Sequence, residues 1–261
     1  MAFDQWEDGD PYERFMGRWS RRLAPLFLQW FNPSKNLSWL DLGCGTGALS
    51  AAIQHYEPGD LLCVDPSENY LEKAKAYVKD PARFAAGDAT NIPADDKSRD
   101  IVVSGLTLNF FPDLPAAFVE IKRVLKPKGT MGAYLWDFSG RMDLLNLLWD
   151  VVTELNPQDN KLDERNRFLV LCDRNNIREA FITAGFINIK TTMLDLPMVF
   201  ADFDDYWDPF LGGQGPAPTY LKSLSAEMLQ KIKERMQEKL VPRPDGKIEL
   251  LARAIAIKGD C

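Results

Sequence analysis

The chain has 261 residues and a formal net charge of −7, with 46% apolar residues and four scattered cysteines. This length suits one α/β domain with an added segment, and the apolar content is enough for a sizeable core. An acidic surface repels phosphate backbones and anionic lipid headgroups, so we expect neither a nucleic-acid partner nor membrane insertion. The N-terminus has no leader pattern and no apolar run approaches ~18 residues, which predicts a cytoplasmic protein. Because no Cys-x-x-Cys pair occurs, we expect neither a metal site nor a disulfide framework.

Short apolar segments alternate with amphipathic segments between residues 38 and 137. The predicted strands cover residues 38–42, 61–64, 83–86, 101–104 and 130–136, and the predicted helices cover residues 48–56, 71–78 and 112–125. The third helix should end at Lys126–Gly129, where proline and glycine both favour termination. Strands this apolar must be covered on both faces, and right-handed crossovers then predict a doubly wound α/β fold with a parallel sheet.

The pattern changes after Asp137. Helices are predicted at 142–155 and 177–184, a sixth strand at 186–194 and a last strand at 248–257. The segment between those two strands contains an aromatic cluster, a glycine-rich loop and a helix, and long insertions of this kind are often lids. We therefore predict an N-terminal helical cap (residues 1–35), a core (residues 36–194 and 246–261) and a helical lid insertion (residues 195–245).

The strongest motif is a glycine-rich loop between the first strand and the first helix, Leu40-Asp41-Leu42-Gly43-Cys44-Gly45-Thr46-Gly47. Gly43 and Gly45 allow a tight turn and close approach of a ligand to the backbone. In open α/β sheets the ligand crevice lies at the carboxyl ends of the strands, where this loop should be. The spacing also fits the G-x-G-x-x-A dinucleotide pattern, but an Asp41 carboxylate would repel a pyrophosphate at the helix N-terminus.

Two further carboxylates end neighbouring strands. Asp65 ends the second strand, where it can accept hydrogen bonds from ribose hydroxyls, and Asp88 ends the third, where it can meet an adenine amino group. S-adenosylmethionine (SAM) carries an α-ammonium and a sulfonium and has no phosphate. Three carboxylates at this edge of the sheet therefore fit SAM better than NAD.

Five segments of the sequence carry a family resemblance. Leu40–Ser50 resembles the first motif of class I SAM-dependent methyltransferases, Val64–Ser67 their acidic ribose position and Gly87–Ala89 their adenine-binding motif. Val102–Asp113 and Leu125–Thr130 resemble later motifs of the type 11 branch, which includes the ubiquinone/menaquinone-biosynthesis type methyltransferases.

The resemblance implies a Rossmann-like fold, a seven-stranded, mostly parallel sheet with an antiparallel last strand. It implies SAM as the cofactor and S-adenosylhomocysteine as its product. It also implies a set of cofactor-binding residues: Asp41, Gly43, Cys44, Gly45, Asp65, Pro66, Asp88, Ala89, Ser104 and Leu106.

Candidates for the acceptor side follow the fourth and fifth strands and lie in the insertion. Asn109, where many relatives carry histidine, and Trp136 are candidate substrate contacts. Asp137 either orients or deprotonates an acceptor or caps the following helix, a role that Ser139 or Asp143 could fill instead. Tyr206 and Trp207 suggest a flat or apolar acceptor, although burial against the sheet explains them too.

The N-terminal segment is rich in aromatic and basic residues. In related enzymes an N-terminal helix covers the methionine end of SAM, so Tyr12 and Arg18 are candidate contacts of the SAM carboxylate. The alternative is a packed helix with solvated arginines. His55 is the only histidine, and we interpret it as a solvated helix residue.

Methyl transfer from SAM needs little covalent help because the leaving group is already good, so alignment and exclusion of water are the main requirements. We predict transfer to a small-molecule acceptor (a phenol, quinol, enolate or amine) by in-line displacement. The alternative is a SAM-binding sensor or subunit without turnover. A nucleotide-dependent oxidoreductase is disfavoured by Asp41 and by the lack of a Tyr-x-x-x-Lys spacing. The sequence specifies neither the acceptor atom nor the oligomeric state.

Overall fold

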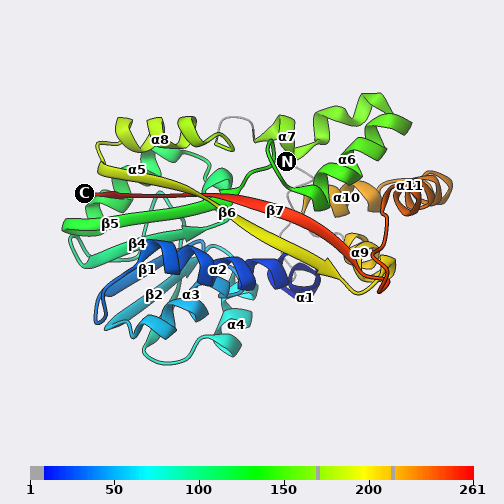
Figure 1. The fold of residues 1–261 in the computed structure, drawn as a ribbon. Coiled ribbons are helices and arrows are strands. Elements are labelled where there is room, and N and C mark those ends of the chain that lie inside the picture. Colours follow the sequence, from blue (N-terminus) through cyan, green and yellow to red (C-terminus); the bar gives the residue numbers. More distant parts are fainter. Residues whose placement is uncertain (1–8, 169–170, 213–214) are drawn as a thin grey trace. The chain divides into compact units, whose positions relative to one another are not determined.

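The fold is seen in a computed structural model that describes residues 9–168, 171–212 and 215–261. Residues 1–8 of the predicted cap lie outside the described residues, as do Gly213 and Gln214 in the glycine-containing loop of the predicted lid insertion. The strands are β1 (Ser38–Leu42), β2 (Asp60–Asp65), β3 (Ala82–Ala86), β4 (Arg99–Gly105), β5 (Leu125–Trp136), β6 (Ile187–Phe200) and β7 (Ile248–Asp260) (Figure 1). The helices are α1 (Gly9–Tyr12), α2 (Arg18–Phe31), α3 (Ala48–Ile53), α4 (Glu68–Tyr77), α5 (Leu114–Val124), α6 (Asp143–Leu155), α7 (Glu164–Arg167), α8 (Arg174–Thr183), α9 (Phe203–Trp207), α10 (Pro216–Lys222) and α11 (Ala226–Lys239).

The seven strands form one sheet in the order β3-β2-β1-β4-β5-β7-β6. The neighbours from β3 to β5 are all parallel. β7 runs against β5, because Cys261 N donates to Gly129 O near the start of β5 while Asp137 N donates to Arg253 O just beyond its end. The predicted seven-stranded, mostly parallel sheet with an antiparallel last strand is therefore confirmed.

The chain divides into two compact units. The core unit consists of Trp19–Leu135, Val170–Leu194 and Ala254–Cys261, and the helical unit consists of Met1–Arg18, Trp136–Leu169 and Asp195–Arg253. This division follows spatial contacts, whereas the predicted boundaries after residues 35, 194 and 245 follow the order of the chain and stay a prediction. No helix among the described residues is both long enough and apolar enough to cross a membrane.

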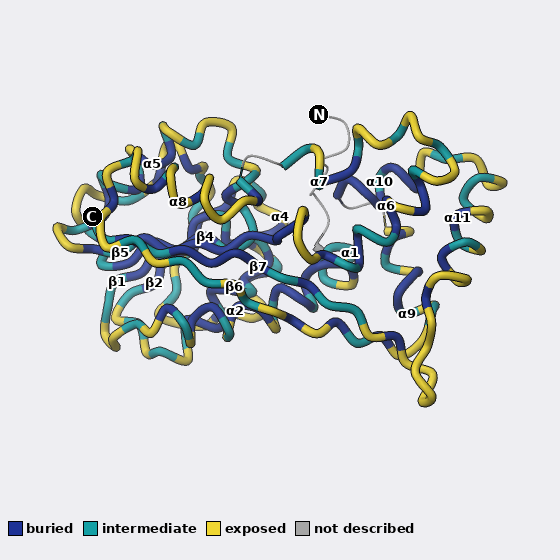
Figure 2. Tube along the Cα trace, turned by 45° about the horizontal axis from the view of Figure 1, so that its top comes forward, coloured by how far each residue is buried: buried dark blue, intermediate teal, exposed yellow. Residues whose placement is uncertain are grey.

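The core unit is packed on both faces of its strands (Figure 1). Side chains alternate between the faces of a strand, so Leu40 belongs to the apolar layer that contains Phe118 of α5 and Phe181 of α8. Trp39 points to the other face, where its ring centroid lies 6.0 Å from that of Phe31 in α2. Figure 2 shows β4 and β5 as mostly buried strands. This two-sided burial explains why the strands read as continuous apolar runs in the sequence.

Two element boundaries differ from the prediction by more residues than the others. β5 begins at Leu125 directly after α5, although we expected a turn at residues 126–129. Arg99 pairs with Leu125 and Ile101 pairs with Thr130, so β5 has more residues than β4 between these two pairs. The extra residues of β5 form a bulge that contains Pro127, which has no N–H to donate to the sheet. β6 continues beyond the predicted end at residue 194 to Phe200.

Candidate functional site

The glycine-rich loop joins β1 to α3 at the carboxyl edge of the core-unit sheet. Gly43, Gly45 and Gly47 have φ angles of 73°, 53° and 84°, which side-chain-bearing residues rarely adopt. The backbone N–H groups of Gly43 and Cys44 both donate to Val64 O in β2, at 2.8 and 3.0 Å. The loop is thus held over the ends of two neighbouring strands, as the sequence predicted.

Gly43 and Gly45 differ in what surrounds them. A Cβ added at Gly43 would lie 2.6 Å from Thr107 Oγ1, whereas a Cβ added at Gly45 would meet no atom within 4 Å. The loop is therefore closed by protein atoms at Gly43 and open at Gly45, where a ligand can approach the backbone.

We expect Gly43→Ala to lower the free energy of unfolding more than Gly45→Ala. Both substitutions carry the cost of a left-handed backbone, ~1–2 kcal/mol, and Gly43→Ala adds an overpacking cost of ~1–3 kcal/mol against Thr107. Denaturant unfolding of the ligand-free variants measures the difference. Equal losses of unfolding free energy in the two variants would show that the Thr107 side chain moves aside without an energetic cost. SAM titration of Gly45→Ala should reveal weaker binding, because its new methyl group occupies the open side.

Asp65 connects β2 to the glycine-rich loop. Its Oδ2 accepts a hydrogen bond from Gly45 N and its Oδ1 accepts one from Ser67 N, each at 2.9 Å. Burial raises the pKa of Asp65, and the two backbone hydrogen bonds oppose that shift. Each carboxylate oxygen keeps a further acceptor position, so Asp65 can also receive hydroxyl groups of a ligand.

Asp41 lies on β1 and is completely buried. Its Oδ2 accepts from Ser50 Oγ at 2.5 Å, and Ser50 in turn accepts from Cys63 Sγ at 3.2 Å. The other oxygen, Oδ1, has no hydrogen-bond partner among the described residues. Burial raises the pKa of Asp41 to about 7, with a smaller contribution from nearby Asp65. An unsatisfied buried carboxylate oxygen is costly, and a donor or cation supplied by a ligand would remove that cost.

The Cys44 side chain does not face a ligand. Its thiol donates to Gly45 O at 3.8 Å, and the interaction with Cys63 together with burial raises its pKa. A contact of Cys44 with SAM would therefore have to come from its backbone. The Cys44 carbonyl already accepts from Gly47 N at 2.9 Å.

The predicted ribose and adenine positions lie on the next two strand ends. Pro66 is exposed directly after Asp65, and Asp88 is exposed after β3. Asp88 Oδ1 accepts from Thr90 N at 2.7 Å and from Thr90 Oγ1 at 2.6 Å, and these bonds lower the pKa of Asp88. The carboxylate is thus ionised and fixed in direction, while the neighbouring Ala89 is buried.

The segment after β4 completes this edge of the core unit. Ser104 Oγ and Thr107 Oγ1 are 2.6 Å apart, and Thr107 also donates to Leu42 O. Leu106 has a φ of 63° and donates its N–H to Tyr134 O at 2.7 Å. Asn109 Nδ2 is buried without a hydrogen-bond partner in the described part of the chain. This amide is therefore a donor that a bound molecule could use.

The sequence did not single out Arg21. This residue of α2 donates from Nη2 to Thr46 O in the glycine-rich loop at 3.2 Å, and its guanidinium lies 3.8 Å from the ring centroid of Tyr77. Several arginines follow one another in this segment, and only the tertiary contact distinguishes Arg21 from Arg18. Arg21 brings a positive charge to the loop.

Arg18 and Tyr12 belong to the helical unit. The Arg18 guanidinium donates to Asp205 Oδ1 at 2.6 Å and to Asp205 O at 3.1 Å, and it lies over the ring of Phe200. The structure thus gives Arg18 a carboxylate partner from its own unit instead of a solvated position. Tyr12 ends the short helix α1 and is partly buried.

Asp137 follows Trp136 at the end of β5, and both are buried within the helical unit. Asp137 Oδ1 accepts from Gly140 N at 2.8 Å and from Ser139 Oγ at 3.4 Å, so the carboxylate stabilises the turn before α6. The helix itself has no side-chain cap, and Asp143 Oδ2 accepts instead from Leu251 N. The prediction that Asp137, Ser139 or Asp143 caps this helix is therefore wrong, because the tight turn after β5 uses the Asp137 acceptor first.

Tyr206 and Trp207 are fully buried in the helical unit. The Tyr206 hydroxyl donates to Leu144 O at 3.0 Å, and the Trp207 ring stacks on that of Phe203 with an interplanar angle of 13°. Both side chains are thus buried, in agreement with the second of the two predicted explanations. Their contact with an acceptor stays a prediction.

Comparison with known proteins places the motifs in a family. A model of the methyltransferase domain matches residues 40–132. A demethylmenaquinone methyltransferase of Lactobacillus johnsonii is 30% identical over 173 residues, which are 60% of this chain and 70% of that protein. A demethylmenaquinone methyltransferase of Staphylococcus saprophyticus is 42% identical over 96 residues, 34% of this chain, and there the chain spans only 40% of the relative's length.

The fold has a counterpart among solved structures. A phosphoethanolamine N-methyltransferase 2 of Haemonchus contortus matches with a TM-score of 0.59 and 19% identity, over 96% of this chain and 56% of that one. At this identity the likeness shows the fold. The family model covers Asp41, Asp65 and Asp88, and the Lactobacillus relative extends the match over most of its own length. The chain therefore belongs to the type 11 branch of the class I SAM-dependent methyltransferases.

Proposed function

We propose that the core unit binds SAM and that the protein transfers the SAM methyl group to a small-molecule acceptor. The observation that carries the proposal is Asp41 Oδ1, a buried carboxylate oxygen that lacks a partner among the described residues, beside a loop that is open at Gly45. A ligand with an ammonium group would satisfy this oxygen. The Haemonchus methyltransferase with the same fold is in complex with S-adenosylhomocysteine.

Each strand end would hold one part of the cofactor. Asp41 would bind the α-ammonium group, Asp65 the ribose hydroxyls and Asp88 the adenine amino group. Arg21 is a better candidate than Arg18 for the SAM carboxylate, because Arg21 contacts the glycine-rich loop and Arg18 is paired with Asp205. When bound, SAM supplies an electrophilic methyl group with a neutral thioether as the leaving group.

The protein would then have to bind and orient the acceptor. Asn109 offers an amide donor, and Asp137 offers a buried carboxylate that can accept a proton or orient a hydroxyl. The two bacterial relatives named above are demethylmenaquinone methyltransferases. A quinol or phenol is therefore the acceptor class that we propose first.

Calorimetric titration of the purified protein with SAM, and with NADH as control, tests the cofactor proposal. We expect saturable binding of SAM and none of NADH, because the buried Asp41 would repel a pyrophosphate. Binding of NADH in place of SAM would overturn the proposal. SAM binding without turnover on any of a series of quinols, phenols, enolates and amines would favour a sensor or subunit.

Asp137→Asn tests the acceptor role separately. We expect SAM affinity within about twofold of the parent chain and a turnover reduced by 10²-fold or more, the lower range of general acid–base effects. The asparagine oxygen can still accept from Gly140 N, so the turn should persist. Turnover is measured with radiolabelled SAM and the best acceptor. Unchanged turnover would leave Asp137 with the structural role alone, and lost SAM binding would contradict its assignment to the acceptor.

A further inference from the structure

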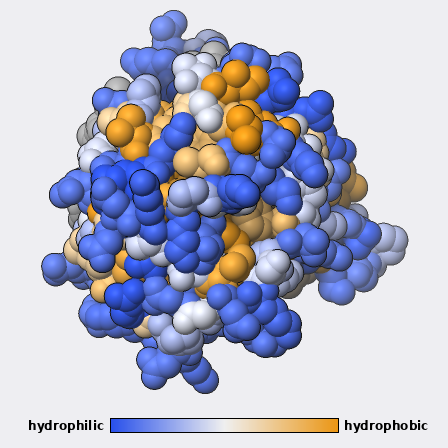
Figure 3. Space-filling view, turned by 90° about the vertical axis from the view of Figure 1, so that its left-hand side faces the viewer, coloured by the Kyte–Doolittle hydropathy of each residue, from blue (hydrophilic) through white to orange (hydrophobic). Residues whose placement is uncertain are grey.

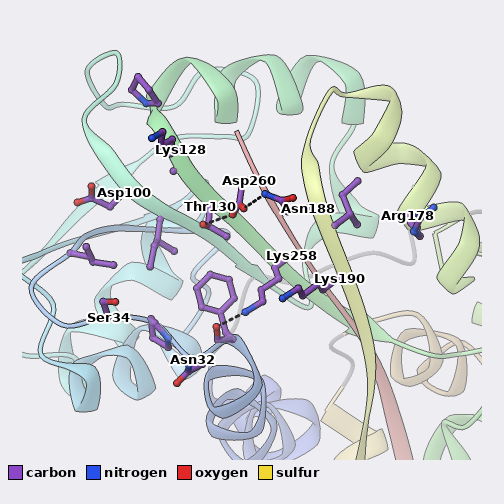
Figure 4. Close-up of a pocket in the computed structure, with 17 residues that line it drawn as sticks. Asn32, Ser34, Asp100, Lys128, Thr130, Arg178, Asn188, Lys190, Lys258 and Asp260 are labelled. Atoms are coloured by element: carbon purple, nitrogen blue, oxygen red, sulfur yellow. Dashed lines mark hydrogen bonds between the residues drawn. The ribbon is translucent and has the colours of Figure 1, made fainter.

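A polar cavity lies in the core unit, at the end of the sheet opposite to the glycine-rich loop. Its volume is about 890 Å³, within the range of small-molecule sites. It is lined by the end of α2 and the segment that follows, the starts of β4, β5 and β6, Arg178 of α8 and the end of β7 (Figure 4). The parallel strands begin here, so the cavity is separate from the proposed SAM site at their carboxyl ends.

Four cationic side chains line this cavity: Lys128, Arg178, Lys190 and Lys258. Two carboxylates, Asp100 and Asp260, also line it, which leaves an excess of positive charge in a chain whose net charge is −7. Seen from this side of the structure (Figure 3), the surface is mostly hydrophilic, with small hydrophobic areas interspersed. Charged and polar side chains are therefore the larger part of what a ligand of the cavity would meet.

The two carboxylates already accept hydrogen bonds from other groups of the protein. Asp100 Oδ2 accepts from Lys126 Nζ and from Ser38 N, both at 2.9 Å. Asp260 accepts from Thr130 Oγ1 at 2.9 Å and from Asn188 Nδ2 at 3.0 Å. In the part of the chain that the structure describes, no carboxylate forms an ion pair with Lys128, Lys190 or Lys258.

Lys258 is held in place within the cavity. Its Nζ donates to Phe31 O at 2.6 Å and lies 5.2 Å and 5.1 Å from the ring centroids of Trp30 and Phe31. Figure 4 shows the Lys190 side chain beside it. Burial lowers the pKa of Lys258, and the nearby Lys190 charge lowers it further, while Asp260 has the opposite effect. Two ammonium groups thus lie close together at a cost that a bound anion would offset.

We propose that this cavity binds a small multivalent phosphate anion, held mainly by Lys190 and Lys258. Phosphate oxygens accept charge-assisted hydrogen bonds from ammonium groups, and the amides of Asn32 and Asn188 and the Ser34 hydroxyl line the same cavity. The proposal is independent of methyl transfer, because none of these residues belongs to the proposed SAM or acceptor site.

The test is a calorimetric titration with pyrophosphate at low ionic strength, without and with saturating SAM. We expect binding in both cases, and loss of roughly tenfold or more in affinity for the double variant Lys190→Gln/Lys258→Gln. The double variant Lys161→Gln/Lys222→Gln is the matched control: it removes the same charge from two exposed lysines of the helical unit, and its affinity should change less than twofold.

Lys190→Glu provides a second test that keeps the Lys258 side chain, and the variant should fold because Lys190 is exposed. Charge reversal at Lys190 should abolish pyrophosphate binding. A cooperative thermal unfolding transition should show that the variant is still folded. Equal losses in the control double variant would reduce the effect to net charge and overturn the proposal. Unchanged binding by Lys190→Glu, or competition between pyrophosphate and SAM, would place the anion elsewhere and also overturn it. Citrate in place of pyrophosphate distinguishes a carboxylate ligand from a phosphate ligand.

Discussion

Replacing Asp65 with alanine is expected to weaken SAM binding by roughly 10- to 150-fold, the effect of losing ~1.5–3 kcal/mol of charge-assisted hydrogen bonding. Asp65 both faces the proposed ribose position and accepts from Gly45 N and Ser67 N. The variant therefore loses a ligand contact and the link that fixes the glycine-rich loop. Calorimetric titration with SAM measures the affinity directly.

Asp95→Ala is the matched control, because Asp95 is an exposed carboxylate outside the proposed site. Its SAM affinity should equal that of the parent chain. Asp65→Asn separates the two functions of the residue: an amide oxygen can still accept from a backbone N–H, but it lacks the charge. An Asp65→Ala variant that binds SAM as tightly as the parent would remove Asp65 from the site.

The free energy of unfolding of the SAM-free protein is expected to fall as pH rises from about 4 to about 7. Burial raises the pKa values of Asp41 and Glu164 to about 7 from their ordinary values of 3.8 and 4.5. Each folded-state pKa lies above its unfolded value, so in this window the native state binds more protons than the unfolded state and loses stability with rising pH. These shifts correspond to a loss of about 4 kcal/mol for Asp41 and about 3 kcal/mol for Glu164 above pH 7.

Glu164→Gln should remove the Glu164 part of this pH dependence. Glu164 Oε2 accepts from the Trp149 indole N–H, and a glutamine oxygen can accept the same hydrogen bond without a buried charge. The variant is therefore expected to be more stable than the parent at pH 8 by about 3 kcal/mol and similar to it near pH 4. Chemical denaturation at several pH values measures the difference.

Glu179→Gln is the control for this experiment, since Glu179 is exposed on α8 and the same chemical change there should leave the pH profile as it is. A stability difference between Glu164→Gln and the parent that is the same at pH 4 and pH 8 would show that packing, not ionisation, is responsible. A parent chain that gains stability between pH 4 and pH 7 would contradict the expected sign.

The sequence alone predicted the elements of the core unit and the family. The predicted apolar strands alternate with amphipathic helices, and that periodicity arises from local backbone geometry and two-sided burial. The glycine-rich loop and the carboxylates at 41, 65 and 88 were also predicted as strand-end residues, because chain order places each one directly after or within a recognisable strand. Their alignment with SAM stays a prediction.

Other features depended on contacts between residues far apart in the chain. Asp137 and Arg18 look available in the sequence, but the structure pairs them with Gly140 N and Asp205, respectively. Tyr206 suggests an aromatic ligand contact in the sequence, whereas in the structure it is a buried packing residue. Hydrogen-bond competition and burial are properties of the folded chain, so residue type and spacing could not distinguish these cases.

The tertiary structure also decided where unpaired groups lie. Nothing in the local sequence shows that Asp41 Oδ1 lacks a partner or that Arg21, three residues after Arg18, contacts the glycine-rich loop. The cavity with Lys190 and Lys258 is formed by segments from six separate parts of the chain. The sequence by itself thus determined the strands, the helices and the motif that identifies the family. Which polar groups are left for ligands was decided only by tertiary packing, because it brings distant side chains together and withdraws others from solvent.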